Sequence, residues 1–235
     1  MSHSLAGHEG TSDHHDHRGR GGLGQTDAMI DHLVLATPDV AATAAAIGEE
    51  WGLALTPGGS HVGLGTRNEL TGLGGSTYLE VVGPDGGQPT PAGPRPFGID
   101  DLVGARLVAW CARPRRRLED VVAAASALGV DLGGVAEMSR RRPDGVLLEW
   151  RLTFPLLAPP FLGTVPFIID WARSPHPSAS LPHECELLAL HITHPHADLV
   201  RAVIAEVGTA ARATVAVGPA GITAEIRTPR GVVTL

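Results

Sequence analysis

The sequence contains no lysine, and all 18 of its basic residues are arginines. Without lysine there is no Schiff-base chemistry, no anchor for pyridoxal phosphate and no Walker-A phosphate-binding loop. Two cysteines, Cys111 and Cys185, are too few for a disulfide framework or for a metal cage made of thiolates. No apolar run approaches the roughly 18 residues that cross a membrane, so we expect no membrane partner.

Basic residues are also in the minority, because 25 acidic residues leave a formal net charge of −7. A nucleic-acid partner is therefore not expected, since phosphate binding needs a basic face. The N-terminus has no apolar segment of the secretory type, and we expect a soluble, cytoplasmic protein. With 43% hydrophobic residues, the 235-residue chain can bury a sizeable core in one or two domains.

The N-terminal stretch differs from the rest of the chain. Residues 1–27 are polar and glycine-rich and include five histidines. Such a stretch buries too little apolar area to order itself, so we predict a disordered tail whose histidines hold metal only loosely.

From residue 28 onward the chain repeats one pattern. Apolar residues at helical spacing predict three helices, each followed by a glycine, at 38–51, 117–128 and 197–207. A strand precedes each helix and three short strands follow it. We therefore predict an α+β fold of repeated βαβββ modules whose mixed sheets curl into a shared cup. The predicted modules, with their Pro/Gly-rich linkers, cover 28–96, 97–182 and, in shorter form, 183–235.

The opening strand of the first module, Met29–Thr37, contains the first candidate site residue. Successive side chains of a strand point to opposite faces. His32 therefore shares one face with Val34 and Ala36, while Leu33 and Leu35 share the other. A histidine fixed in this way is a candidate ligand in a cupped site, although a half-buried histidine with a hydrogen-bond partner fits the pattern as well.

Several motifs carry a resemblance to a known family. The βαβββ repeat resembles the glyoxalase, bleomycin-resistance and dioxygenase-like fold of the vicinal-oxygen-chelate superfamily, most closely its glyoxalase-like domain group. The motifs that carry it are Asp31–Thr37, His61–Asn68, Thr77–Gly83, Arg142–Gly145, Trp150–Pro155 and Pro166–Trp171. The resemblance covers residues 28 to about 176 and reaches the third module only by pattern. It implies a fold more strongly than a reaction, because this fold hosts many chemistries.

The resemblance also implies a metal site. In the family, the first and last strands of a module supply a histidine and a glutamate, which are His32 and Glu80 here, and Glu80 has the same facing as His32. Asp170 takes the place of Glu80 in the second module, whose first strand offers no ligand. Mixed nitrogen and oxygen ligands suit a divalent metal such as Zn, Fe, Mn or Ni. An ion pair between Glu80 and an arginine, or a hydrogen-bonded strand end at Asp170, is the structural alternative.

Other polar residues are candidates for catalysis and substrate binding. His61 is a candidate further ligand or general base, so that His61 and Glu80 form the predicted catalytic pair. Arg67 and Asn68 are candidates for holding substrate oxygens, Arg151 for pairing with an anion or a carboxylate, and Trp171 for lining the mouth of the cup. A polar hairpin remains the structural alternative for the segment from His61 to Asn68. The arginine runs 115–117 and 140–142 are predicted to be solvated.

Two functions follow from these residues. The first is a metal-dependent lyase, isomerase or dioxygenase that chelates neighbouring oxygens of a small substrate and stabilises the oxyanion that forms. The second is a metal-free module that binds a small anionic ligand through Arg67, Asn68 and Arg151. In both, the expected partner is a small molecule, and a homodimer is one assembly that the sequence allows.

Overall fold

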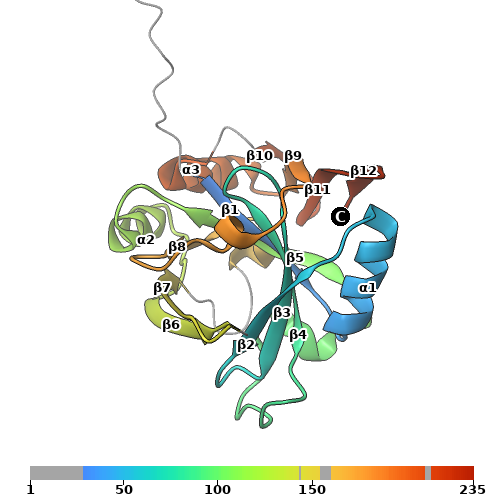
Figure 1. Cartoon of the computed structure of the whole chain (residues 1–235). Helices are drawn as coiled ribbons and strands as arrows, with labels where there is room; N and C mark the ends of the chain where they lie inside the picture. Colours follow the sequence, from blue (N-terminus) through green and yellow to red (C-terminus); the bar gives the residue numbers. More distant parts are fainter. Residues whose placement is uncertain (1–28, 143, 154–159, 210–212) are drawn as a thin grey trace, which may run out of the picture.

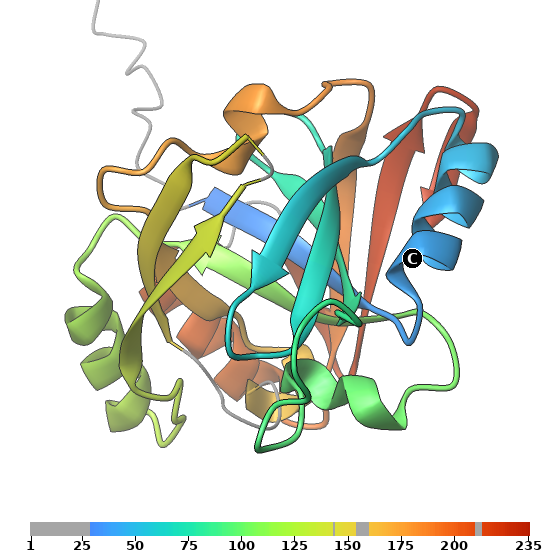
Figure 2. The same ribbon diagram turned by 60° about the horizontal axis from the view of Figure 1, so that its bottom comes forward.

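The computed structural model of the chain describes residues 29–142, 144–153, 160–209 and 213–235. The predicted disordered tail lies outside these residues. The described part forms a closed eight-stranded barrel and a separate four-stranded sheet that packs beside it (Figures 1 and 2). No helix in the described ranges has the length and apolarity needed to cross a membrane.

Two halves with the same connectivity make up the barrel. The first half contains β1 (Met29–Ala36), α1 (Val40–Trp51), β2 (Thr56–His61), β3 (Thr66–Gly72) and β4 (Tyr78–Pro84). The second half contains β5 (Arg106–Arg113), α2 (Leu118–Ala127), β6 (Val135–Arg141), β7 (Leu147–Thr153) and β8 (Phe167–Asp170). The strand order around the barrel is β1-β4-β3-β2-β6-β7-β8-β5. The predicted α+β fold with a curled mixed sheet is therefore confirmed, and β2 and β6 join the two halves through the pairing of Ser60 with Arg141.

Strand alternation separates the inside of the barrel from its outside, as the sequence predicted. Val34 and Ala36 belong to the interior cluster of buried side chains, together with Tyr78 and Val82 of β4. The outward side chains of β1 and β4 belong to a second cluster, called here the outer core, which joins the barrel to the helices and includes Leu33, Leu35, Leu79, Val81 and Trp51. Helices α1 and α2 lie on opposite sides of the barrel (Figure 1).

The third unit has the predicted order of elements but a different pairing of strands. It contains β9 (Glu186–Thr193), α3 (Ala197–Val207), β10 (Ala213–Ala216), β11 (Gly221–Thr228) and β12 (Gly231–Thr234). Its sheet order is β10-β9-β11-β12, so the first strand lies inside the sheet rather than next to the last strand. The unit lies outside the shared cup, and its apolar side chains enter the outer core. One continuous core joins this sheet to the barrel. The predicted division into domains stays a prediction.

Both cysteines are buried free thiols, which allows a simple test of the core. Burial, helped by the charge of Glu184, raises the pKa of Cys185 to about 11. Burial and the nearby Asp31 carboxylate raise the pKa of Cys111 well above its ordinary range. Because the thiolate is the reactive form, we expect alkylation by iodoacetamide at about pH 8.5 to be on the order of 100-fold slower than in the unfolded chain. Peptide mass mapping with and without guanidinium chloride measures both rates, and fast native labelling of either thiol contradicts the packing described here.

Candidate functional site

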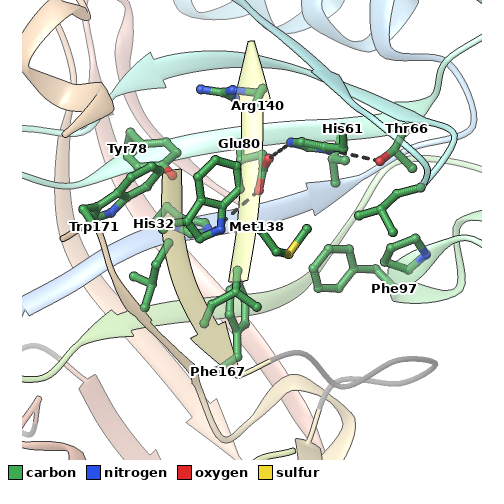
Figure 3. A pocket seen from close by; sticks show the side chains of 16 residues that line it. His32, His61, Thr66, Tyr78, Glu80, Phe97, Met138, Arg140, Phe167 and Trp171 are labelled. Atoms are coloured by element: carbon green, nitrogen blue, oxygen red, sulfur yellow. Dashed lines mark hydrogen bonds and ion pairs between the residues drawn. The ribbon is translucent and has the colours of Figure 1, made fainter. Parts of the chain in front are cut away.

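The barrel encloses a cavity that brings the polar residues of both halves together (Figure 3). Its volume of about 60 Å³ leaves room for several water molecules or a small ligand. Most of its wall is apolar and aromatic, and includes Tyr78, Phe97, Met138, Trp150, Phe167 and Trp171. Two histidines, one carboxylate and one guanidinium interrupt this wall, namely His32, His61, Glu80 and Arg140. A few polar groups in an apolar hollow are typical of a small-molecule site.

His32 is held in place by the residue before it. The pairing of β1 with β5 shifts register between Ile30 and His32, which marks a β-bulge at Asp31. Because of this bulge, two adjacent side chains meet, and His32 Nδ1 lies 2.8 Å from Asp31 Oδ1. An ionised carboxylate only accepts hydrogen bonds, so Nδ1 is the donor, and Nε2 is the ring atom that lies toward Glu80.

Asp31 is fully buried and collects further donors. Trp171 Nε1 donates to its Oδ2 at 3.1 Å, and His176 Nε2 lies 3.0 Å from the same oxygen. Burial by itself raises the pKa of Asp31, but the hydrogen bonds from His176 and His32 outweigh burial and hold this pKa well below its usual range. Asp31 is therefore an ionised group that orients His32 from behind, away from the cavity.

Glu80 of β4 lies between the two cavity histidines (Figure 3). Its Oε2 is 3.7 Å from His32 Nε2, and its Oε1 is 3.6 Å from His61 Nε2. The Asn68 amide donates to Oε1 at 2.5 Å. Burial raises the pKa of Glu80, whereas the neighbouring His32 and His61, the Asn68 hydrogen bond and the charge of Arg140 lower it further than burial raises it. Glu80 is therefore ionised, and its two oxygens serve different neighbours.

His61 completes the polar group from β2. Its Nδ1 lies 3.0 Å from Thr66 Oγ1, and its Nε2 lies 3.2 Å from Asn68 Nδ2. Burial lowers the pKa of His61, despite the opposing effect of Glu80, so this imidazole stays neutral. With Nδ1 as a donor to Thr66, Nε2 is an acceptor, and the second N–H of the Asn68 amide donates to it.

Three predicted site residues lie outside the cavity, and their placement corrects the prediction. On β3, Asn68 points inward, so Arg67 points outward and binds Glu69 at 2.8 Å. Arg151 of β7 points outward for the same reason and forms an ion pair with Glu119 of α2. Asp170 is exposed at the end of β8, where it accepts a hydrogen bond from the Ala172 amide. Strand alternation around a closed barrel places all three on the wrong face for a shared site.

The remaining predicted residues do lie around the cavity. His32, His61, Glu80 and Trp171 line it, and Asn68 supports Glu80 from just behind the wall. The distance and the common facing of His32 and Glu80 meet the geometric condition for a shared ion. Their roles as ligands and catalysts stay predictions.

Two important residues were missed by the sequence reasoning. Asp31 was not considered, because simple alternation places it on the face opposite to His32, and only the bulge overrides this. Arg140 was predicted to be solvated with its run of arginines, but it is only 5% exposed. The available signal was its even spacing from Met138 on the same strand, since both side chains line the cavity.

A second group of potential metal ligands lies beside the cavity. Atoms of Asp31, His32 and Cys111 lie within 4.8 Å of one another. The Asp31 carboxylate already accepts three hydrogen bonds there, and a metal requires the thiolate form of Cys111, whose pKa is raised. The Nε2 side of His32, toward Glu80, is therefore the better place for a cation.

The comparisons with known proteins agree with this architecture. A family model described as a glyoxalase-like domain matches residues 30–208, which is most of the chain. The chain therefore belongs to the glyoxalase-like domain family, within the vicinal-oxygen-chelate superfamily. A comparison with curated proteins gave no match.

Solved structures resemble the chain in fold alone. A hypothetical protein from Staphylococcus aureus shares 16% identity over 76% of this chain and 74% of that chain, with a TM-score of 0.52. A methylmalonyl-CoA epimerase from Streptomyces coelicolor, in complex with 2-nitronate-propionyl-CoA, shares 19% identity over 64% of this chain and 99% of that chain, with a TM-score of 0.40. The epimerase from Mycobacterium tuberculosis shares 15% identity over 60% and 84% of the chains, with a TM-score of 0.37.

Proposed function

We propose that the chain is an enzyme that holds a divalent metal ion between His32 and Glu80 and acts on a small, oxygen-rich substrate in the cavity. The proposed reactions are those that the family resemblance implies, namely a lyase, isomerase or dioxygenase reaction. The observation that carries the proposal is the gap of 3.7 Å between His32 Nε2 and Glu80 Oε2. This gap is too long for a hydrogen bond, and it suits two ligands that bind one ion at about 2 Å each.

The surroundings of this pair also suit a metal. A metal-binding histidine commonly donates its other N–H to a carboxylate, as His32 does to Asp31. Among the described residues, no hydrogen bond occupies His32 Nε2 or Glu80 Oε2. Mixed nitrogen and oxygen donors fit Zn, Fe, Mn or Ni. When bound, such an ion supplies Lewis-acid chemistry to neighbouring oxygens of a substrate.

His61 is the residue that we assign to proton transfer. Its lowered pKa keeps it neutral near pH 7, and a substrate that displaces the Asn68 hydrogen bond from Nε2 is able to give its proton to that atom. Thr66 and Asn68 hold the ring in position. His61 and Glu80 are both largely buried, which strengthens the electrostatic interactions between these groups.

The alternative function, a metal-free module that binds an anion, loses two of its three predicted residues. Arg67 and Arg151 bind Glu69 and Glu119 on the outside of the barrel. One observation still favours anion binding, because Arg140 is buried beside the cavity and its Nε atom has no acceptor among the described residues.

Metal binding is the property that tests the proposed function. A full-length variant with the five histidines of residues 1–27 replaced by glutamine removes background binding. We expect it to bind one zinc ion per chain in calorimetry and elemental analysis. His32→Ala and Glu80→Gln should each weaken binding by more than about 100-fold, which exceeds the usual effect of an outer-shell residue.

Matched variants separate the alternatives. Asp170→Asn and Arg67→Gln change predicted site residues outside the cavity and should leave the zinc affinity unchanged. Cys111→Ser should also leave the zinc affinity unchanged. If Cys111→Ser weakens zinc binding strongly and Glu80→Gln does not, the ion is bound by Asp31, His32 and Cys111 instead. A chain that binds no divalent metal contradicts the proposal.

A further inference from the structure

Arg140 of β6 is a buried cation that forms one side-chain hydrogen bond among the described residues. Its NH1 donates to Asn68 Oδ1 at 2.9 Å, and Asn68 in turn donates to Glu80. Among the described residues, no carboxylate forms an ion pair with Arg140, and its Nε is a buried donor without an acceptor. A buried charge is costly unless it is paired. This position therefore calls for an acceptor that the described protein residues do not supply.

A second unpaired donor lies on the neighbouring strand. Trp150 of β7 is buried, and its indole Nε1 has no acceptor among the described residues. The pairing of β6 with β7 sets Trp150 opposite Met138, two residues from Arg140, so that both side chains lie on the inner face. Both residues line the cavity. Native proteins leave few buried donors unpaired, so two at one cavity point to a missing ligand.

The backbone is shaped around this arginine. A Cβ added at Gly58 would lie 2.1 Å from Asn68 Oδ1 and 2.9 Å from Arg140 NH1. The glycine therefore leaves the space in which the amide and the guanidinium meet. The Asn68 amide lies between Arg140 and Glu80 and binds both. The guanidinium is therefore close to the Glu80 carboxylate without forming an ion pair with it.

We propose that Arg140 and Trp150 form an anion subsite for the carboxylate of the substrate, whose reacting oxygens lie at His32 and Glu80. This inference rests on the proposed function and narrows its substrate class to short organic acids that carry a further oxygen function. A carboxylate matches the planar fork of a guanidinium, and its single charge balances the single charge of Arg140. A phosphate dianion would bring a second charge into a small apolar cavity, at a large cost in desolvation.

The proposed subsite acts by orienting the substrate in the cavity. A short acid anchored at Arg140 places its other end against Glu80 and His61. Fixing a small molecule at two points reduces the freedom that must be lost before reaction. The subsite therefore selects for acids over their neutral analogues.

The test compares an acid with its neutral isostere in the full-length protein. The probes are isobutyrate and isobutyramide, and binding is followed by calorimetry and by the fluorescence of Trp150 and Trp171, both of which line the cavity. We expect isobutyrate to bind at least about tenfold more tightly, as a charge-assisted hydrogen bond allows. Arg140→Gln should abolish this preference, Arg140→Lys should retain part of it, and Trp150→Phe should reduce it.

Control variants exclude other sites for the acid. Arg140 also borders a smaller cavity of about 30 Å³ that Arg142 lines but Trp150 does not. An acid bound there would respond to Arg142→Gln and ignore Trp150→Phe, and that result overturns the proposal. Equal binding of acid and amide to the wild type overturns it as well, whether or not Arg140→Gln folds.

Failure of this inference is distinguishable from failure of the proposed metal site. The acid preference is measured in metal-free protein after treatment with a chelator, and zinc binding is measured without the acid. If the chain binds no zinc but still prefers the acid, the proposed metal site is contradicted and the anion subsite is supported. Zinc binding without an acid preference supports the proposed metal site and contradicts the anion subsite.

Discussion

Replacement of Asp31 by asparagine is expected to lower the free energy of unfolding by about 3–5 kcal/mol, the usual cost of breaking a buried charge network. The Asp31 carboxylate is fully buried and is in contact with His32 Nδ1, Trp171 Nε1 and His176 Nε2, at 2.8, 3.1 and 3.0 Å. An amide turns an NH₂ group toward some of these donors and leaves them without an acceptor. Chemical denaturation of the two proteins measures the difference.

The same substitution should weaken zinc binding by about 10- to 100-fold, because Asp31 orients a proposed ligand from the outer shell. Asp170→Asn is the matched control, since Asp170 is exposed and its substitution should change neither quantity. If Asp31→Asn retains wild-type stability and zinc affinity, the arrangement of His32, Asp31 and His176 has no structural role.

The pH dependence of this difference in stability has a definite sign. The pKa of Asp31 is lowered in the folded state, so the folded state releases its proton more readily than the unfolded state. The stabilisation is therefore present above the ordinary pKa of about 4 and is lost as the pH falls from there toward the lowered value. The wild type and Asp31→Asn should approach each other in stability only on the acid side of about pH 4.

Deletion of residues 183–235 is expected to prevent the barrel from folding as a stable unit. Leu187, Leu190 and Ile192 of β9 belong to the same outer core as Leu33 and Trp110 of the barrel. Each fully buried side chain of this type contributes about 1.5–3 kcal/mol. More than a few such losses exceed the net stability of a domain, which is about 5–15 kcal/mol.

Circular dichroism and solubility of a chain that ends at residue 182 measure this effect. Supplying residues 183–235 as a separate polypeptide is the matched control, and it should restore part of the folded signal by covering the exposed apolar face. A truncated chain that melts cooperatively near the wild-type temperature would show that the third unit is an independent domain, as the predicted boundary at 182 implies.

Patterns among residues close together in sequence predicted the helices well. The helical spacing of Val40, Ala44, Ile47 and Trp51 predicted α1, and these four residues are its buried face. Gly52 and Gly208 end α1 and α3 in the left-handed conformation, at φ 78° and 89°. These features were predictable because they depend on residues within one or two turns of each other.

Alternation along single strands also predicted that His32 and Glu80 face the same way. Both residues lie within strands of the barrel, and the parallel pairing of β1 with β4 places Val34 opposite Glu80. The rule failed at Asp31, where a bulge adds a residue to one strand and turns its side chain toward its neighbour. A bulge depends on the partner strand, which a single stretch of sequence does not identify.

The arginines show most clearly what only the tertiary structure decided. Arg67, Arg140 and Arg151 all lie on short strands, and composition does not distinguish them. Closing the barrel turned Arg67 and Arg151 toward solvent and carboxylate partners, and turned Arg140 toward the cavity. Which face of a strand becomes the inside depends on how eight strands close around one axis.

The sequence by itself thus determined the helices, the repeat of βαβββ order, the facing of His32 and Glu80, and the exclusion of lysine chemistry, because these follow from composition and from neighbours along the chain. The tertiary structure decided the Asp31 bulge, the inward Arg140 and the different pairing of the third sheet. Each of these depends on contacts between residues far apart in sequence, where packing and the pairing of buried charges outweigh local preference.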